Sequence, residues 1–351
     1  MQAVDSFRDR ILDAAARGAR LRIRGGGSKD WYGNAARGEV LDTRAWRGIV
    51  SYEPAELVIT ARAGTPLAEI EAALAERGQM LAFEPPHFGP DATLGGAIAA
   101  GLSGPRRASV GAVRDFVLGA VLMDGRGQVL HFGGQVMKNV AGYDVARLLT
   151  GSLGTLGLLL EVSVKVLPKP VCEATLRIAC DQVEALRLLN TWGGQPLPLS
   201  ASCWTGGALW VRLAGARAAV EEAQRLLGGE PVADAEGFWR SLREQEHGWF
   251  QGPGDLWRLS LPAHGLPLAL GDTLIEWGGA QRWVRIDPDF DAAGLRHAIA
   301  RAGGHATLWR APHKAVGAFH PLAPAVARIH ARLWDEFDPQ HVFDRERLYA
   351  D

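Results

Sequence analysis

Short apolar runs alternate with turn residues over the first 63 positions of the chain. Four runs rich in β-branched residues are separated by glycine, aspartate and proline, a pattern typical of short strands. They are "LRIR" (21–24), "EVLDT" (39–43), "GIVSY" (48–52) and "LVITARA" (57–63). Apolar residues at helical spacing also predict a helix ahead of the strands, over residues 5–18.

The next segment, residues 64–78, predicts a helix with Thr65 as its N-cap, Pro66 in the first turn and Gly78 as its terminator. A strand is expected at "MLAFEPP" (80–86). Three more apolar strands are expected at "FVLGAVLMD" (116–124), "VLHFGG" (129–134) and "GLLLEVSVKVL" (157–167). Because two prolines in "LPKP" mark a boundary, residues 1–171 are predicted to form one α+β domain.

The pattern changes at residue 172. Strand and helix signals over residues 173–229 follow the order β-α-β-β-α, which indicates a ferredoxin-like α+β fold. A less regular second pass follows, with helices in 237–250 and 291–303 and strands at 256–262, 281–287 and 305–311. We expect a cap domain over residues 172–312. Residues 313–351 are expected to form a helix that stops before Pro339 and a tail that returns to the first domain.

The composition excludes several classes of protein. Lysine and arginine total 38 against 39 acidic residues, so no net field attracts nucleic acid or an anionic membrane. The three cysteines, Cys172, Cys180 and Cys203, are too few for an iron–sulfur cluster or a cysteine-rich zinc site, and we expect no bound metal.

The sequence also gives an expectation about location. The first residues lack the basic-then-apolar order of a signal peptide, and no apolar run reaches the roughly 20 residues of a membrane helix. We therefore expect a cytoplasmic protein, and peripheral association with the inner face of the membrane through a partner stays open.

The stretch "LRIRGGGSKDWYG" (21–33) runs a strand into three successive glycines. Its spacing fits neither the P-loop nor the GxGxxG fingerprint of dinucleotide-binding folds. The alternatives are a tight surface turn or a nest of main-chain N–H groups that binds anionic oxygens, with Ser28 and Lys29 as further donors.

Two further glycine elements favour the second alternative. In "GPDATLGGAIAAGLSG" (89–104), Asp91 and Thr93 precede a short helix whose N-terminal N–H groups are expected to face an anion. In residues 138–162, Gly151, Gly154 and Gly157 lead into an apolar strand whose backbone could contact an adenine edge. Three such elements in one domain indicate an extended nucleotide cofactor.

The motifs "RIRGGG", "PDATLGG", "GAVRDFVLGAVLMDGRG", "KNVAGYD" and "GSLGTLG", in this order over about residues 20–170, resemble the FAD-binding domain of the vanillyl-alcohol oxidase, or PCMH, type. More narrowly, "RGGGSKDWYG", "FEPPHFG", "KNVAGYDVARLLTGSLGTLG" and "FDPQHVFD" are similar to the FAD-binding subunits of bacterial glycolate oxidases. The resemblance implies an α+β protein, in which a PCMH-type domain of two α/β subdomains precedes the ferredoxin-like cap.

The resemblance also implies the residues that hold FAD. They are Gly25, Gly26, Gly27 and Ser28 at the pyrophosphate, Pro90, Asp91, Thr93, Leu94, Gly95 and Gly96 between pyrophosphate and flavin, Ser103 and Gly104 near the ring, and Gly154, Gly157 and Leu159 near the adenosine. Many relatives attach FAD to a histidine just after the glycine turn, where this chain has Ser28 and Lys29. Noncovalent FAD is therefore expected.

Catalytic residues are harder to assign. Related 2-hydroxy-acid dehydrogenases carry paired histidines in the cap, often with a glutamate and a divalent metal, and the HxxxxxxH spacing is absent here. The candidates are Arg258 and Arg310 for a substrate carboxylate and His305 for the hydroxyl proton. The alternative is that the arginines pair with surface acids and that His305 is an ordinary strand histidine.

Three functions stay open. The resemblance implies the FAD-binding subunit of a complex that oxidises glycolate to glyoxylate and passes electrons to an iron–sulfur subunit and a quinone-type acceptor. A larger FAD-binding subunit and the iron–sulfur subunit would then be its partners. The other two functions are a self-sufficient dehydrogenase of D-2-hydroxy acids such as D-lactate, and a non-catalytic assembly subunit.

Overall fold

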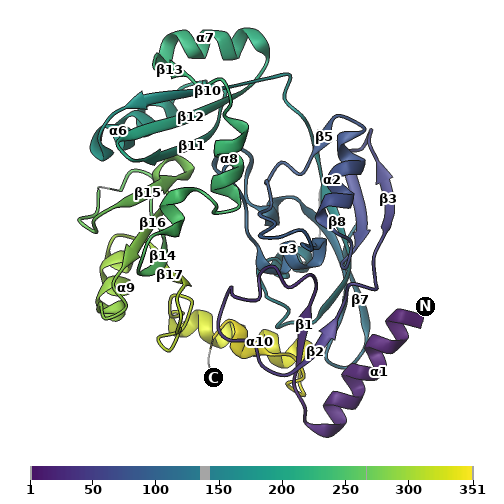
Figure 1. The fold of residues 1–351 in the computed structure, drawn as a ribbon. Helices are drawn as coiled ribbons and strands as arrows, with labels where there is room; N and C mark the ends of the chain where they lie inside the picture. The colour runs from purple at the N-terminus through teal and green to yellow at the C-terminus, as the bar shows by residue number, and fades with distance from the viewer. Residues whose placement is uncertain (1, 135–142, 266, 350–351) are drawn as a thin grey trace. The chain divides into compact units, whose positions relative to one another are not determined.

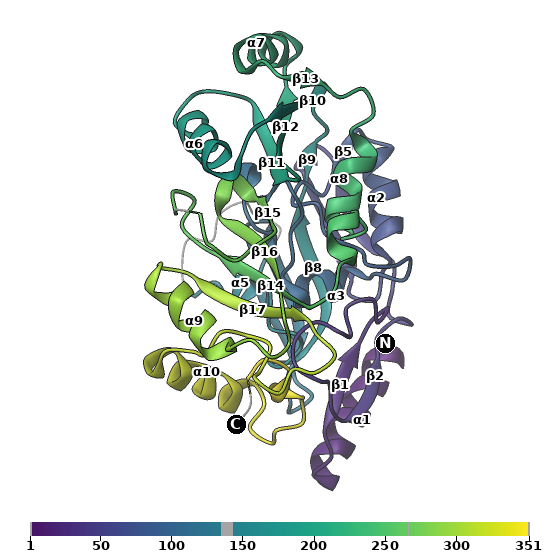
Figure 2. The ribbon, with the colours of Figure 1, turned by 60° about the vertical axis from the view of Figure 1, so that its left-hand side comes forward.

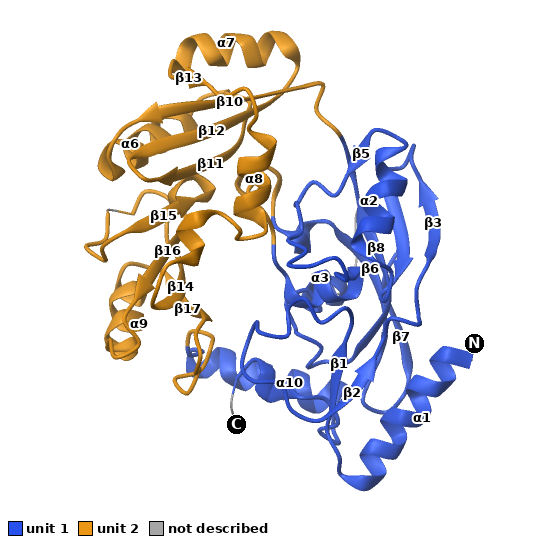
Figure 3. Cartoon of the chain, in the orientation of Figure 1, with its two compact units in different colours: residues 1–102, 112–168, 321–351 blue, residues 103–111, 169–320 orange. Residues whose placement is uncertain are grey.

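A computed structural model of the chain describes residues 2–134, 143–265 and 267–349. It divides into two compact units (Figure 3). Unit 1 comprises residues 1–102, 112–168 and 321–351, and unit 2 comprises residues 103–111 and 169–320. No helix in the described ranges combines the length and the apolar character needed to cross a bilayer.

Unit 1 contains a five-stranded antiparallel sheet in the order β3-β4-β8-β6-β7 (Figure 1). Its strands are β3 (Ile49–Glu53), β4 (Val58–Arg62), β6 (Val117–Met123), β7 (Val129–Gly133) and β8 (Leu158–Lys165). Most residues of β4, β6 and β8 are buried, as their near-continuous apolar runs predict. The helices α2 (Leu67–Ala75) and α3 (Leu94–Ala100) belong to the same unit.

A second layer of unit 1 is built on the parallel pair β1 (Leu21–Arg24) and β2 (Glu39–Asp42). One face of α1 (Gln2–Arg17) packs into this layer through Phe7, Ile11 and Ala14. Leu21 and the buried Val342 and Phe343 share that core cluster, so the end of the chain completes it. The unit also contains the short elements β5 (Gln79–Met80), β9 (Leu167–Pro168) and α5 (Val145–Leu148) and the longer helix α10 (Pro324–Phe337).

Unit 2 contains an eight-stranded sheet in the order β13-β10-β12-β11-β15-β16-β14-β17 (Figure 2). The first half runs β10 (Cys172–Ala179), α6 (Gln182–Gly193), β11 (Leu199–Thr205), β12 (Ala208–Gly215), α7 (Arg217–Leu227) and β13 (Glu230–Pro231). This β-α-β-β-α-β order confirms the ferredoxin-like expectation for the cap.

The second half of unit 2 repeats the same strand order along the sheet. It runs β14 (Asp255–Ser260), β15 (Thr273–Glu276), β16 (Gln281–Ile286), α9 (Ala292–Arg301) and β17 (His305–Arg310). No helix is found between β14 and β15 in the described residues, which is the irregularity visible in the sequence. The two halves join edge to edge, where Cys203 pairs with Glu276 and Trp204 with Ile275.

The two faces of the unit 2 sheet differ. Leu209, Val211 and Leu213 of β12 lie in an apolar cluster with residues of α6 and α7. Because side chains alternate along a strand, Trp210 and Arg212 point to the opposite face. There Trp210 stacks on Phe238 of α8 (Glu236–Arg243), with the ring centres 4.2 Å apart. The helix α8 therefore covers part of an aromatic and cationic face.

Two local predictions are wrong. The expected strand over residues 80–86 forms β structure only at Met80, the last residue of β5. The expected N-cap of α2, Thr65, is fully buried, and its hydroxyl accepts from the Gly48 N–H at 2.9 Å. Pro66 is the N-cap instead, because the Thr65 hydroxyl is already bonded to Gly48, the residue before β3.

The unit boundaries differ from the predicted ones in three places, of which the smallest is the start of the second part of unit 2 at residue 169 instead of 172. Residues 103–111, which include α4 (Arg107–Val110), belong to unit 2 although the sequence placed them in the domain 1–171. Two contacts hold them there: Arg106 forms an ion pair of 2.5 Å with Glu173, and the Trp277 indole donates to the Gly104 carbonyl at 3.1 Å. Residues 313–320 also belong to unit 2, and residues 321–351 lie in unit 1.

Candidate functional site

The glycine turn after β1 packs directly against residues 91–93. A Cβ atom on Gly25 would lie 2.4 Å from the Thr93 hydroxyl oxygen, and one on Gly26 would lie 1.5 Å from the Asp91 carbonyl oxygen. Gly27 has a φ of +75°, in the left-handed region that favours glycine. Gly25 and Gly26 therefore allow the turn to pack more closely against residues 91–93 than any side chain would permit, and Gly27 is favoured by its backbone conformation.

The N–H groups of this turn are available as donors. In the described ranges, no protein acceptor receives the N–H of Gly25, Gly26, Gly27 or Ser28. These four residues are only half-buried, so a ligand can reach them. The Lys29 ammonium adds a positive charge beside the turn and donates to the His87 carbonyl at 3.1 Å. Successive main-chain donors next to a cation suit an anionic ligand such as a diphosphate.

The second glycine element forms the expected short helix, α3, and Thr93 is its N-cap, with its hydroxyl accepting from the Gly96 N–H at 3.2 Å. The expected free donors at this helix end are absent from the described structure. The Leu94 N–H donates to the Thr65 carbonyl at 2.9 Å and the Gly95 N–H to the Ala63 carbonyl at 2.8 Å. The expectation of free donors at this helix end is therefore wrong, and the role of Pro90, Asp91, Thr93, Leu94, Gly95 and Gly96 at the cofactor stays a prediction.

The third glycine element lies beside the first two. The Leu153 N–H donates to the Ala99 carbonyl of α3 at 2.9 Å, and a Cβ on Gly154 would lie 3.3 Å from Ile23 of β1. Gly157 has another reason to be glycine, because a Cβ there would lie 2.7 Å from the Met123 carbonyl of β6. Leu159 is buried in the strand β8. Most of the motif "KNVAGYD" (138–144) lies outside the described residues.

An open cleft of about 720 Å³ adjoins the glycine turn in unit 1. It is lined by Asp42, Arg44, Ala45, Arg47, Gly64, Pro66, Pro90, Asp91 and Thr93. Three of the residues expected at the cofactor, Pro90, Asp91 and Thr93, are among them, and the first two are exposed. The volume falls in the range of small-molecule sites, about 300–1,000 Å³.

Arg44 and Arg47, which the sequence did not identify as site residues, line the cleft. Arg44 binds the Asp42 carboxylate through two nitrogens, at 3.0 and 2.6 Å, and lowers the pKa of that carboxyl through these hydrogen bonds. Arg47 lines the same cleft. Both belong to "DTRAWRG" (42–48), a polar loop that carries no motif when it is read alone.

The catalytic candidates of unit 2 share its aromatic and cationic face. Arg258 of β14 pairs with Thr307 of β17, and Ser260 pairs with His305. The Arg258 guanidinium lies 4.6 Å from the centre of the Trp309 ring and, within the described residues, makes no ion pair. The structure therefore places Arg258 and His305 on adjacent strands of one face.

The charges on this face are mostly positive. His305 is exposed, and its pKa lies below the ordinary histidine value, first because neighbouring atoms exclude part of its water and then because Arg258, His320 and Arg107 are positive. Burial is the main cause that lowers the pKa of Arg310, followed by the charge of Arg285. A neutral histidine beside an arginine can accept a proton near neutral pH. Ser103 and Gly104 also lie in unit 2.

Comparison with known proteins agrees with this geometry. A family model described as "FAD binding domain" matches residues 2–133. The chain is 50% identical over 333 residues to glycolate oxidase subunit GlcE of Escherichia coli K12, which covers 94% of this chain and 93% of that protein. The chain belongs to the family of glycolate oxidase subunit GlcE. This is a family of FAD-dependent oxidoreductases, and the cofactor of the chain is FAD.

More distant relatives match part of this GlcE-family chain. Glycolate oxidase subunit GlcD of Bacillus subtilis is 32% identical over 148 residues, 42% of this chain and 31% of that protein. D-lactate dehydrogenase of Archaeoglobus fulgidus is 39% identical over 110 residues, 30% of this chain and 24% of that protein. A solved structure of alkyldihydroxyacetonephosphate synthase matches with a TM-score of 0.68 at 14% identity, over 96% of this chain and 73% of that one. This last likeness supports the PCMH-type α+β fold.

The residues of the glycine turn fit FAD. Its diphosphate needs several donors close together, and the turn of this GlcE-family chain offers successive N–H groups without a protein acceptor in the described structure, held by close packing against Asp91 and Thr93. In the described part of the chain, no group of three or more histidine, cysteine, aspartate or glutamate side chains could hold a metal ion.

Proposed function

We propose that this chain is the FAD-binding subunit of a complex that oxidises glycolate to glyoxylate and passes the electrons to an iron–sulfur partner and a quinone-type acceptor. The observation that carries the proposal is the 50% identity to glycolate oxidase subunit GlcE over nearly the full length of both chains. Identity at that level over both units makes a shared role in a shared assembly the simplest interpretation.

In this proposal the main chain of unit 1 holds the cofactor without a covalent bond. The N–H groups of Gly25, Gly26, Gly27 and Ser28 bind the diphosphate, and Lys29 adds its charge. Pro90, Asp91 and Thr93 border the cleft that continues from the turn. The three cysteines all lie in unit 2, at positions 172, 180 and 203, and the turn carries no histidine. When bound, FAD supplies the hydride acceptor.

Unit 2 supplies the candidate substrate contacts. Arg258 is half-buried with no carboxylate partner in the described structure, so it can bind a substrate carboxylate with two parallel hydrogen bonds. His305, neutral near pH 7 because of its lowered pKa, can accept the hydroxyl proton of a 2-hydroxy acid. Arg310 is assigned a supporting positive charge beside them.

The partners in this proposal are a second, larger FAD-binding subunit and an iron–sulfur subunit. The partial similarity to glycolate oxidase subunit GlcD supports the first partner. That protein is also named a glycolate oxidase subunit, and the match covers 42% of this chain and 31% of that protein. We place the assembled complex in the cytoplasm, with peripheral attachment to the membrane through its partners.

A self-sufficient dehydrogenase of D-2-hydroxy acids is the second candidate. The 39% identity to D-lactate dehydrogenase over 110 residues favours it, although that match covers 30% of this chain. Arg258 and His305 would serve such an enzyme without a second subunit. A non-catalytic assembly subunit is the third candidate, and it requires no reaction at the flavin.

Purification of the chain alone and with its co-expressed partners separates these candidates. We expect the chain alone to carry one FAD, visible as the flavin absorption band, and dye reduction by glycolate to require the partners. Dye reduction by D-lactate with the chain alone would favour the self-sufficient enzyme. A flavin that anaerobic glycolate fails to bleach, even in the complex, would favour the assembly subunit and contradict the proposal.

A further inference from the structure

The segment 344–348 is bonded to residues that follow the glycine turn. The Asn34 N–H donates to the Arg347 carbonyl at 3.0 Å. The Asn34 side-chain amide donates to the Glu346 carbonyl at 2.8 Å and to the Leu348 carbonyl at 3.3 Å. Asn34 and Glu346 are 312 positions apart in the sequence, and their segments thus lie side by side in unit 1.

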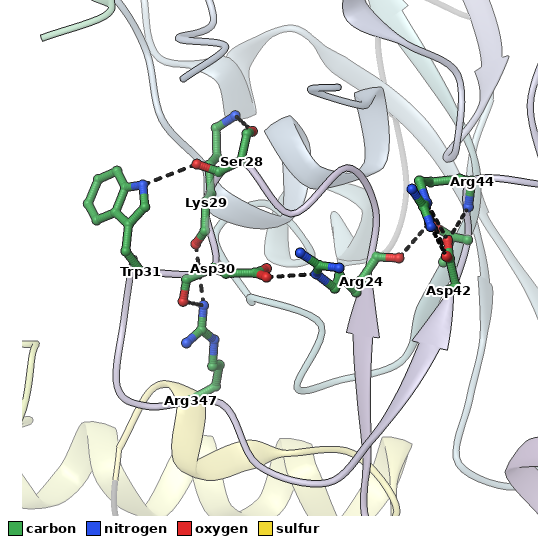
Figure 4. A network of polar contacts seen from close by, with 9 residues as sticks. Arg24, Ser28, Lys29, Asp30, Trp31, Asp42, Arg44 and Arg347 are labelled. Carbon is green, nitrogen blue, oxygen red and sulfur yellow. Dashed lines mark hydrogen bonds and ion pairs between the residues drawn. The ribbon is translucent and has the colours of Figure 1, made fainter. Parts of the chain in front are cut away.

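The Arg347 guanidinium binds main-chain carbonyls of the same loop (Figure 4). It donates to the Asp30 carbonyl at 2.9 Å, to the Lys29 carbonyl at 3.4 Å and to the Asn34 carbonyl. These acceptors are main-chain atoms, so the contacts constrain the path of the loop rather than its side chains. A planar guanidinium with donors in fixed directions can hold several carbonyls at once.

The contacts continue from this loop to the last glycine of the turn. The Asp30 carboxylate forms an ion pair of 2.6 Å with Arg24, and the Asp30 N–H donates to the Gly27 carbonyl at 3.1 Å. A Cβ on Gly27 would lie 2.2 Å from a terminal nitrogen of Arg24. Arg347, Arg24 and Gly154 also line one small hollow of about 30 Å³. The tail is therefore connected to two of the three glycine elements.

The tail has an anchor that does not involve Arg347. Asp338 accepts from the Val342 N–H at 2.9 Å and from the Phe343 N–H at 2.7 Å. The Leu21 N–H donates to the Val342 carbonyl at 2.7 Å, and Val342 and Phe343 lie in the core. These contacts hold the end of the chain on unit 1 independently of Arg347. The bonds of Arg347 are thus additional to this anchor.

We propose that Arg347 is a positioning residue for the cofactor: it holds the backbone of Lys29 and Asp30 so that the N–H groups of the preceding glycine turn face the FAD diphosphate. This inference rests on the proposed role of the glycine turn. A preorganised donor set binds its ligand more tightly than one that must be ordered on binding. Loss of the guanidinium is therefore expected to weaken FAD binding more than it weakens the fold.

The test compares R347M and R347K with R126M in the full-length chain. Arg126 is the matched control, because its guanidinium also donates to a carbonyl of the C-terminal region, that of Glu336 at 2.8 Å, but contacts no residue of the glycine turn. The measurements are the dissociation constant of FAD for the apoprotein and the thermal unfolding of the same apoprotein. Mutation of residues that support the ligands of a metal site typically costs about 10-fold to 100-fold in affinity, and we expect a loss of the same order here.

We expect R347M to bind FAD about 10-fold to 100-fold more weakly, R347K to recover part of the loss, and R126M to bind as the wild type does, with only a small loss of apoprotein stability that is similar in R347M and R126M. Equal affinity of R347M and the wild type would overturn the inference and leave the glycine site intact. The inference would also be overturned if R126M lost as much FAD affinity as R347M, or if R347M lost apoprotein stability to the same degree as FAD affinity. If R347M does not fold, R347K compared with R126M decides, because a lysine keeps the charge but lacks the planar donors that hold several carbonyls at once. A wild-type chain that binds no FAD would overturn both this inference and the glycine site.

Discussion

The cofactor region of unit 1 and the aromatic face of unit 2 are built in opposite ways. In unit 1 the donors are main-chain N–H groups, and the decisive residues, Gly25 to Gly27, contribute by lacking side chains. In unit 2 the chemistry lies in large side chains, such as Arg258 on Trp309 and Trp210 on Phe238. The first site is sensitive to the addition of a methyl group, and the second to the removal of a side chain.

The substitution G26A in unit 1 should cause the largest effect, a loss of FAD affinity. Its Cβ would lie 1.5 Å from the Asp91 carbonyl oxygen, so the backbone of the turn must move. We expect FAD affinity to fall about 1,000-fold, which corresponds to roughly 4 kcal/mol. The measurement is FAD titration of the apoprotein by flavin fluorescence. The matched control is G193A, in which the new Cβ meets no atom within 4 Å; similar losses in both variants would contradict the account.

The substitution E276A should have the converse effect in unit 2. Glu276 is 4% exposed and accepts from the Trp283 indole at 2.7 Å and from the Gln281 amide at 3.0 Å. Its loss leaves two buried donors without an acceptor, which should lower the free energy of unfolding by about 3 kcal/mol. Denaturant unfolding measures this. The exposed Glu230 gives the control E230A, which should cost at most about 1 kcal/mol. A change in the FAD affinity of E276A would contradict the expected separation between cofactor binding in unit 1 and stability in unit 2.

The pH dependence of activity tests the role of His305 on the aromatic and cationic face of unit 2. His305 must be neutral to accept a proton, and its lowered pKa means that protonation removes activity only below about pH 6.5, the ordinary histidine value. In the assembled complex, H305Q should lower kcat about 100-fold and abolish this acidic limb. The exposed His297 gives the control H297Q. An unchanged pH profile in H305Q would exclude His305 as the base.

The smallest effect is expected for G237A in α8. Gly237 is exposed in the helix, and a Cβ there meets no atom within 4 Å. The substitution should raise the free energy of unfolding by about 0.5–1 kcal/mol, because alanine loses less backbone entropy in a helix than glycine does. Denaturant unfolding should show the gain, with no change in FAD affinity. Destabilisation would mean that the covering helix is more tightly constrained than its contacts indicate.

The sequence predicted the glycine elements well for a physical reason. Only glycine lacks a Cβ, so a position that cannot accommodate one is identified by its residue type, as at Gly25, Gly26 and Gly154. The short helix after Thr93 was also predicted, since the residues that begin it are neighbours in sequence. The ferredoxin-like order of unit 2 also followed from local periodicity alone.

The predictions that were wrong depended on partners far away in the sequence. The Thr65 hydroxyl bonds Gly48, and the N–H groups at the start of α3 are taken by the carbonyls of Ala63 and Thr65, none of which a local pattern could show. The strand β15 was missed because four residues are too few for a period. Arg347 was missed because its acceptors are backbone carbonyls about 310 positions earlier, as the separation of 317 from Asp30 records.

The most direct test of the central claim is a structure of the chain with FAD bound. The account predicts the diphosphate oxygens within hydrogen-bond distance, about 2.7–3.2 Å, of the N–H groups of Gly25, Gly26, Gly27 and Ser28. A diphosphate bound elsewhere, with these N–H groups facing water or protein acceptors, would contradict it.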